Sequence, residues 1–239
     1  MERLSNITLY NADCMEIMKG FSDKQFDLAL VDPPYGIGFG NFNRTNKAEC
    51  GKRVKANKYK NSNWDSSAPA DDYFIELKRI SKNQIVWGGN YFEFLANKQN
   101  ENLKTIEQFN NYINKSDQSW IFWYKQNPVP NFADGELAWC SFENVKDQFN
   151  FKYFGNIEGN TSASNKIHPT QKPVALYKWL LNKYAKSGDT ILDTHLGSGS
   201  PAIAAHDGGF EFTGIELDEE YYNAAKQRLI LHQRQLNLF

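Results

Sequence analysis

Four consecutive residues, Asp32-Pro33-Pro34-Tyr35, combine a carboxylate, a stiff turn and an aromatic ring. They follow the apolar run Phe26–Val31, which is short and ends at a chain breaker, as a buried strand does. The two prolines fix φ near about −65° and remove two backbone N–H donors, so the turn presents carbonyl oxygens. Such a turn can accept hydrogen bonds from a planar amino group and stack on its ring. A Pro-Pro turn with no chemical role is the alternative.

A second group of residues has the composition of a nucleotide-type cofactor pocket. The strand predicted over Thr190–Asp193 leads into a loop with Gly197 and Gly199, where the missing Cβ lets the backbone turn sharply and approach a ligand. Glu216 ends the next predicted strand, 19 residues after Gly197, and this spacing suits a carboxylate that accepts both hydroxyls of a ribose. Asp193 places a negative charge beside the loop.

The same loop also satisfies a loose dinucleotide fingerprint, Gly197-x-Gly199-x-x-Ala202, so a nicotinamide-dependent oxidoreductase is an alternative. Asp193 argues against it, because this carboxylate would repel a pyrophosphate but would attract the cationic end of an amino-acid-bearing cofactor. Only 23 residues follow Glu216. The substrate site must therefore come from upstream sequence, where the Asp32 turn lies.

Asp13 lies between a β-prone run, Ile7–Tyr10, and a helix predicted over Met15–Gly20. Its simplest role is the N-cap of that helix. It also follows a strand end, and α/β sheets bind ligands at the carboxyl ends of their strands.

The elements that must position these residues alternate between strands and helices. Further strands are predicted at Gln84–Trp87, Trp120–Tyr124 and Glu136–Phe142, and further helices at Asp71–Ile80, within Asn97–Gln118, after Pro173, at Pro201–His206 and from Asp218 to about Gln235. This alternation predicts an α/β fold with a doubly wound, mostly parallel Rossmann-like sheet and helices on both faces. With no repeat and no linker in the sequence, residues 1–239 are expected to form a single domain.

Residues 37–63 carry the strong charge asymmetry of the chain, seven basic residues against Glu49. A stretch this polar buries too little surface to fold alone, and beside the Asp32 turn it is predicted to contact nucleic-acid phosphates. A solvated loop is the alternative, and Trp64 is either a core anchor or a ring that stacks on a base. The candidate residues are Arg44, Lys47, Lys52, Arg53, Lys55, Lys58, Lys60 and Trp64.

Bulk composition limits the functional class. The net charge is −1, so any basic surface must be local. Three widely spaced cysteines, Cys14, Cys50 and Cys140, lack metal-ligand spacing, and they favour a reducing cytosol over a disulfide framework. No metal site is expected. No apolar run approaches the roughly 20 residues of a membrane helix, and no signal peptide is visible, so we expect a soluble cytoplasmic protein.

Five motifs, taken in chain order, resemble those of the amino-methylating DNA methyltransferases that use S-adenosylmethionine. The order is the permuted one, in which the catalytic motif precedes the cofactor motif, and the resemblance covers nearly the whole chain. The motifs are Asn11-Ala12-Asp13-Cys14, Asp32-Pro33-Pro34-Tyr35, His168-Pro169-Thr170-Gln171-Lys172-Pro173, Asp193-x-x-x-Gly197-x-Gly199 and Glu216. The cofactor loop departs from the family's pattern, because Thr194 and His195 replace its proline and aromatic positions.

The resemblance implies a role for each motif. The target base would be rotated out of the duplex, and the Asp32 carboxylate and the Pro33 carbonyl would accept the two N–H bonds of its amino group. Tyr35 would stack on the base, and Pro34 would stiffen the turn. Catalysis would then rest on positioning and electrostatics. The residues implied for the cofactor are Asp13 (adenine amino group), Glu216 (ribose), Thr170 and Lys172 (methionine carboxylate), with Asp193, His195, Gly197 and Gly199 in the loop.

The identity of the acceptor remains open at this stage. The family's adenine-N6 enzymes usually begin the catalytic motif with Asp or Asn and its cytosine-N4 enzymes with Ser, so Asp32 favours adenine N6 in double-stranded DNA. Cytosine N4, RNA, a protein amide and a non-catalytic nucleic-acid-binding module are the alternatives. Residues 37–63, 97–118 and 143–167 are candidates for reading the DNA sequence. Candidate protein partners are a second copy of the chain, in a homodimer, and a cognate restriction endonuclease.

Overall fold

The computed structural model describes residues 1–37, 65, 67–96, 103–126, 133–152 and 167–236. The strands in these ranges are β1 (Glu2–Leu4), β2 (Ile7–Asn11), β3 (Phe26–Val31), β4 (Ser81–Trp87), β5 (Ser119–Tyr124), β6 (Gly135–Cys140), β7 (Lys146–Asn150), β8 (Thr190–Asp193) and β9 (Glu211–Glu216). The helices are α1 (Cys14–Met18), α2 (Asp71–Ile80), α3 (Ile106–Lys115), α4 (Val174–Tyr184), α5 (Ser200–Gly208) and α6 (Glu219–Leu236), with a 3₁₀ turn, η3, at Gly89–Tyr91.

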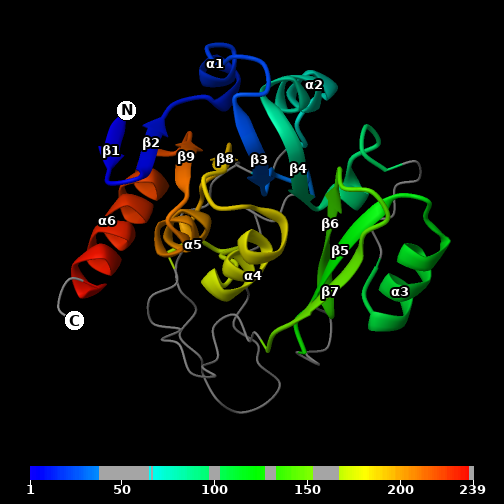
Figure 1. Ribbon diagram of the computed structural model, residues 1–239. Coiled ribbons are helices and arrows are strands. Elements are labelled where there is room, and N and C mark those ends of the chain that lie inside the picture. Colours follow the sequence, from blue (N-terminus) through cyan, green and yellow to red (C-terminus); the bar gives the residue numbers. More distant parts are fainter. Residues whose placement is uncertain (38–64, 66, 97–102, 127–132, 153–166, 237–239) are drawn as a thin grey trace.

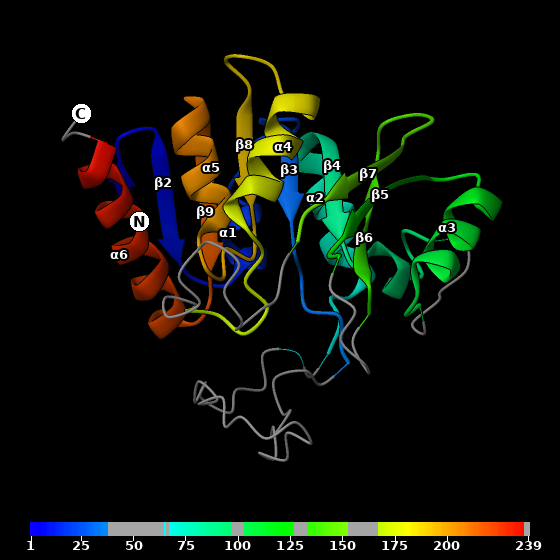
Figure 2. The same cartoon turned by 90° about the horizontal axis from the view of Figure 1, so that it is seen from below.

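All nine strands belong to one sheet with the order β1-β2-β9-β8-β3-β4-β6-β5-β7 (Figures 1 and 2). The central strands β2, β9, β8, β3 and β4 are parallel to one another. Strand β6 runs antiparallel to both of its neighbours, β4 and β5, and β1 is antiparallel to β2. The predicted fold class, a doubly wound and mostly parallel α/β sheet, is confirmed.

Helices cover both faces of the sheet (Figure 1). Residues of α4, α5 and α6 form one core with alternate residues of the strands, including Leu28 and Leu30 of β3. The other residues of β3, Ala29 and Val31, join a second core with α1 and α2. This burial on both sides explains why the last four residues of β3, Leu28–Val31, are all apolar.

Helix α3 packs on the far part of the sheet, against β5 and β6. Its Phe109 and Ile113 join a third core with Trp120 and Phe122 of β5. A capping box at its start, in which Thr105 and Gln108 bond each other's backbone N–H groups, fixes where the helix begins. The amphipathic helix predicted within 97–118 is therefore present, and it covers part of the core.

Two strands were not predicted as regular elements. Strand β1 pairs with β2 at one edge of the sheet, and β7 lies at the other edge beside β5. Both are short, and β7 lies in the 143–167 region, where the sequence shows no clear periodicity.

None of the helices in the described ranges is long and apolar enough to span a membrane.

Candidate active site

Four predicted site residues lie at the same edge of the sheet, where the central parallel strands end. Asp13 follows β2, Glu216 ends β9, Asp193 ends β8 and Asp32 follows β3. These strands are neighbours in the order β2-β9-β8-β3, and parallel strands bring their carboxyl ends to one edge. The structure therefore brings both halves of the predicted site together.

The Asp32 turn is held from several sides. Pro33 is buried, whereas Asp32, Pro34 and Tyr35 are half-buried. One carboxylate oxygen of Asp32 accepts a hydrogen bond from the Tyr35 hydroxyl at 2.8 Å. The turn ends at Gly36, whose φ of +74° favours glycine and whose N–H donates to the buried Asp65 at 2.9 Å.

Tyr35 is packed within an aromatic group rather than projecting alone. Its ring stacks on Tyr91 of η3, with centroids 4.9 Å apart and an interplanar angle of 11°. Gly88 lies directly against this ring, since a Cβ there would come within 2.2 Å of it. A base that stacks on Tyr35 must therefore use ring surface that Tyr91 and Gly88 leave uncovered, or the ring must shift.

Lys172 forms an ion pair with Asp32, although the sequence resemblance implied that this lysine binds the cofactor carboxylate. Its side chain is only 3 % exposed, and its Nζ lies 2.5 Å from the second carboxylate oxygen of Asp32. The same Nζ lies 3.1 Å from Glu136, at the start of β6. Lys125, just after β5, pairs with Glu136 at 2.6 Å.

Glu136 and Lys125 had no predicted role. Because β6 runs antiparallel to β4, its first residues lie at the edge where the parallel strands end. An acid at the start of the otherwise apolar run Glu136–Cys140 was the available signal in the sequence. Together, Asp32, Lys172, Glu136 and Lys125 form a row of alternating charges.

The pKa values follow from this packing. Burial opposes the charge of Glu136, but Lys125 and Lys172 outweigh it and lower the pKa of this carboxyl to about 2. Burial also opposes the charge of Lys172, yet its two carboxylate partners raise the pKa of the ammonium. Burial raises the pKa of Asp32, and the Lys172 charge acts in the opposite direction. Lys172 is therefore the main group that favours ionised Asp32, and the hydrogen bond from Tyr35 acts in the same direction.

The cofactor half of the site is held by backbone donors. The Asp193 carboxylate accepts the His195 N–H at 3.0 Å. Glu216 accepts the Gly197 N–H at 2.8 Å and the Asp218 N–H at 3.0 Å. Burial raises the pKa of Asp193 to about 8, with backbone bonding as the main opposing cause, and burial also raises the pKa of Glu216.

The glycine loop joins these carboxylates to the segment before α4. Gly197 and Gly199 have φ values of +52° and +71°, and a Cβ at Gly199 would press against Ala225 at 3.1 Å. The His168 ring lies 3.9 Å from the place that a Cβ on Gly197 would take. Thr170, predicted as a cofactor contact, shares a 3.1 Å hydrogen bond with that ring.

His195 and Asp13 occupy the ends of this half-site. Burial lowers the pKa of His195 to about 4, so the imidazole is neutral near pH 7, and it lies edge-on to Tyr73. It thus behaves as a small aromatic ring. Asp13 is exposed, and its carboxylate accepts the Met15 N–H at 2.7 Å, which confirms the N-cap interpretation.

This half-site fits a ligand with a positive charge. Glu216 lies close enough to Asp193 to raise the proton affinity of that carboxylate, and Lys172 is committed to Asp32 and Glu136. Each carboxylate oxygen has two lone pairs, so Glu216 can still accept hydroxyl donors. The donor set therefore suits S-adenosylmethionine, with its cationic centre and its ribose.

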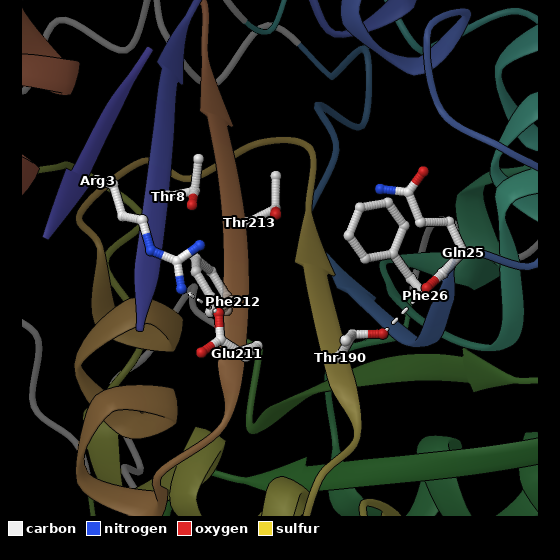
Figure 3. A pocket seen from close by; sticks show the side chains of 8 residues that line it. All are labelled: Arg3, Thr8, Gln25, Phe26, Thr190, Glu211, Phe212 and Thr213. Atoms are coloured by element: carbon white, nitrogen blue, oxygen red, sulfur yellow. Dashed lines mark hydrogen bonds and ion pairs between the residues drawn. The ribbon is translucent and has the colours of Figure 1, made fainter. Parts of the chain in front are cut away.

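A hollow lies where the parallel strands begin, at the opposite ends of these strands from the site, and it is unrelated to the site (Figure 3). Its lining comes from the first residues of β2, β3, β8 and β9 and includes the surface pair Arg3 and Glu211. Ligands of parallel α/β sheets bind at the carboxyl ends instead. The predicted DNA-contacting residues from Arg44 to Trp64 lie outside the described residues.

Comparisons with known proteins find DNA methylases. Residues 138–227 match the DNA methylase family of the N6/N4 type. The type II methyltransferase M.HinfI of Haemophilus influenzae is 29 % identical, over 93 % of this chain and 68 % of its own length.

Two solved structures share the fold. The M1.HpyAVI–SAM complex is 22 % identical, with a TM-score of 0.55 over 93 % of this chain and all of that chain. The PvuII DNA methyltransferase, described as cytosine-N4-specific, is 15 % identical, with a TM-score of 0.56 over 98 % of this chain and 94 % of that chain.

Proposed function

We propose that this chain, an S-adenosylmethionine-dependent DNA methyltransferase related to the N6/N4 family, methylates the exocyclic N6 amino group of adenine. The observation that carries the choice of adenine is Asp32. This carboxylate begins the catalytic turn where cytosine-N4 enzymes usually have serine, and it lies at the strand edge beside the cofactor half-site.

An adenine amino group is a poor nucleophile, because its nitrogen lone pair is delocalised into the ring. An Asp32 oxygen and the Pro33 carbonyl are offered as acceptors for its two N–H bonds, and these bonds favour a pyramidal nitrogen with a localised lone pair. The turn is rigid, so the acceptors need no reorganisation during the reaction. Tyr35, and Tyr91 stacked on it, supply aromatic surface for the base.

The methyl donor, when bound, supplies an electrophilic methyl group on a positively charged sulfur. Glu216 would hold its ribose, Asp193 would lie beside its positive charge, and Asp13 would accept from its adenine amino group. Gly197 and Gly199 allow the loop backbone to approach it closely. We propose that residues 1–239 form a single methyltransferase domain in which these groups cooperate.

The base itself must leave the duplex, because its amino group is inaccessible within the stack. We propose that the basic residues of 37–63 hold the DNA phosphates. Replacing Lys52, Arg53 and Lys55 by Gln should weaken DNA binding at 100 mM salt and lower the slope of log affinity against log salt by up to about 3. An unchanged slope, measured by fluorescence anisotropy on a duplex, would contradict this assignment.

The test of the proposed function is the identity of the modified base. Purified protein and S-adenosylmethionine are incubated with unmodified genomic DNA or, in a separate reaction, with total RNA, and the nucleic acid is digested to nucleosides for mass spectrometry. We expect N6-methyladenine. N4-methylcytosine would retain the enzyme class and overturn the acceptor, whereas methylation of RNA alone or of no nucleic acid would overturn the DNA substrate. Sequencing the modified DNA would also give the recognition sequence.

A further inference from the structure

Lys172 is the best buried cation of the described part of the molecule, and its surroundings differ from those of a ligand-binding lysine. Its side chain is 3 % exposed, and its ammonium bridges Asp32 at 2.5 Å and Glu136 at 3.1 Å. It also lies 5.3 Å above the centre of the Trp87 ring. These contacts fix the ammonium from three elements, namely β3, β6 and β4.

We infer that Lys172 is a positioning residue for methyl transfer, whose ammonium, held by Glu136, orients Asp32 and keeps it an ionised acceptor for the amino group of the target base. The inference rests on the proposed function and deepens it. It replaces the cofactor-carboxylate role that the sequence resemblance implied for this lysine.

Asp32 has enough acceptor positions to bind Lys172 and an incoming base together. Its two oxygens carry about four lone-pair positions, of which Lys172 and the Tyr35 hydroxyl each take one. At least one position on each oxygen is left. An incoming N–H can therefore bind Asp32 without displacing Lys172.

The charge state of Asp32 depends on Lys172. A buried carboxylate without a cation takes up a proton, and protonated Asp32 would present an O–H that competes with the N–H of the base. The groups that act on Asp32 come from every element around it: Lys172 before α4, Glu136 of β6, Asp193 of β8, and the hydroxyls of Tyr35, Tyr73 of α2 and Tyr177 of α4. Among them only Lys172 is cationic.

Glu136 both holds Lys172 in place and offsets its charge. Its second partner, Lys125, fixes it from β5 at 2.6 Å, and this row of two acids and two bases has no net charge. Glu136 thereby offsets the Lys172 charge, which would otherwise repel the positively charged methyl donor a short distance away. During transfer the nitrogen lone pair forms the N–C bond, the C–S bond breaks with its electron pair left on the now neutral sulfur, and the methylated nitrogen releases one proton to solvent. Lys172 keeps its own protons throughout.

The test compares Lys172→Met with Lys183→Met, which removes a surface ion pair with Asp147 on the outer side of α4. With genomic DNA and saturating S-adenosylmethionine, we expect Lys172→Met to lower kcat about 100-fold and to move the acid limb of its pH profile to higher pH. Calorimetry should give a Kd for S-adenosylhomocysteine within about twofold of the wild type. Lys183→Met should change neither.

A measurement without turnover separates this inference from the proposed function. In protein labelled with ¹³C at the aspartate carboxyls, the Asp32 signal is assigned by its loss in Asp32→Asn, and its titration should move to higher pH in Lys172→Met. If Lys172→Met does not fold, two other variants test the same inference. Glu136→Gln should lower kcat about tenfold. Lys172→Arg should keep the titration of Asp32 near that of the wild type.

Two results would overturn the inference. One is a weakened Kd for S-adenosylhomocysteine with an unchanged Asp32 titration, which would return Lys172 to the cofactor carboxylate. The other is a Lys172→Met protein that matches Lys183→Met in kcat and in titration. Wild-type protein that methylates no DNA would instead overturn the proposed function, and the carboxyl titration would still decide the role of Lys172.

Discussion

The two halves of the site compensate the negative charge of their buried carboxylates in different ways. At the catalytic turn, Asp32 and Glu136 are paired with Lys172 and Lys125, so the protein supplies the cations itself. At the cofactor loop, the partners seen for Asp193 and Glu216 are backbone N–H groups, among the residues that the structure describes. A pocket whose acids lack a built-in cation is suited to a ligand that brings one.

This difference assigns a task to each half. The catalytic half has fixed its charges before any ligand arrives, as an acceptor for a neutral amino group requires. The cofactor half holds a proton on Asp193 near pH 7, since burial raises its pKa to about 8, and a cationic ligand would replace that proton. Each prediction below alters one half and leaves the other intact.

The largest effect is expected at the catalytic half. Asp32→Ala removes the carboxylate that accepts the base's N–H, so kcat should fall by at least about 10³-fold, while the Kd for S-adenosylhomocysteine changes by less than about threefold. Tritium transfer to DNA and calorimetry measure the two quantities. The matched control is Asp27→Asn near the other end of β3, whose carboxylate bonds Thr190 and Lys82. Near-wild-type turnover in Asp32→Ala would refute the mechanism.

At the cofactor half, a substitution is expected to weaken cofactor binding strongly and to change kcat little. Glu216→Gln keeps the size of the side chain but loses its charge and one acceptor, so the Kd for S-adenosylhomocysteine should rise about 10- to 100-fold. With saturating cofactor, kcat should change far less. Glu211→Gln, at the start of the same strand, is the control, because it breaks only the surface pair with Arg3. Equal Kd values for the two variants would mean that Glu216 has no contact with the ligand.

The sequence was sufficient for the parts of this site that local patterns encode. The Asp32 turn was predictable because β3 is buried on both faces and two prolines end it. The loop at Gly197 and Gly199 was predictable because its positive φ values require glycine. The alternation of strands with helices then predicted the parallel sheet that brings the Asp32 turn and the glycine loop together.

The two ion pairs by which Lys172 bridges Asp32 and Glu136 were not predictable from local sequence patterns. Lys172 and Asp32 are 140 positions apart, and Glu136 reaches them only because β6 runs antiparallel beside β4. No local pattern carries the position of a strand within a sheet. The motif therefore identified Lys172 as a functional residue, whereas its partners depend on the tertiary fold.

A smaller effect tests the proton on Asp193. Because its pKa is about 8, binding of a cationic ligand should release a proton, and affinity for S-adenosylmethionine should fall as pH is lowered from 8 to 6, by up to about tenfold per pH unit. Calorimetry in two buffers of different ionisation enthalpy measures the released proton. Asp193→Asn should bind more weakly and lose this proton release. Proton release that persists in the variant would assign it to another group.

The smallest effect should appear in stability without ligand. The folded-state pKa of Asp193, about 8, lies above the usual value of 3.8 for an aspartate carboxyl, so the folded protein holds this proton more tightly than the unfolded chain. Stability from Asp193 is therefore present below about pH 4 and is lost as pH rises towards 8. Asp193→Asn should raise Tm by about 2–4 °C at pH 8, equivalent to about 1 kcal/mol in a chain of this size, and by less at pH 5. Asp32→Asn should give no such gain, because the buried Lys172 would lose one of its two carboxylate partners. If both variants gained stability equally at pH 8, the two halves would not differ in how they balance charge.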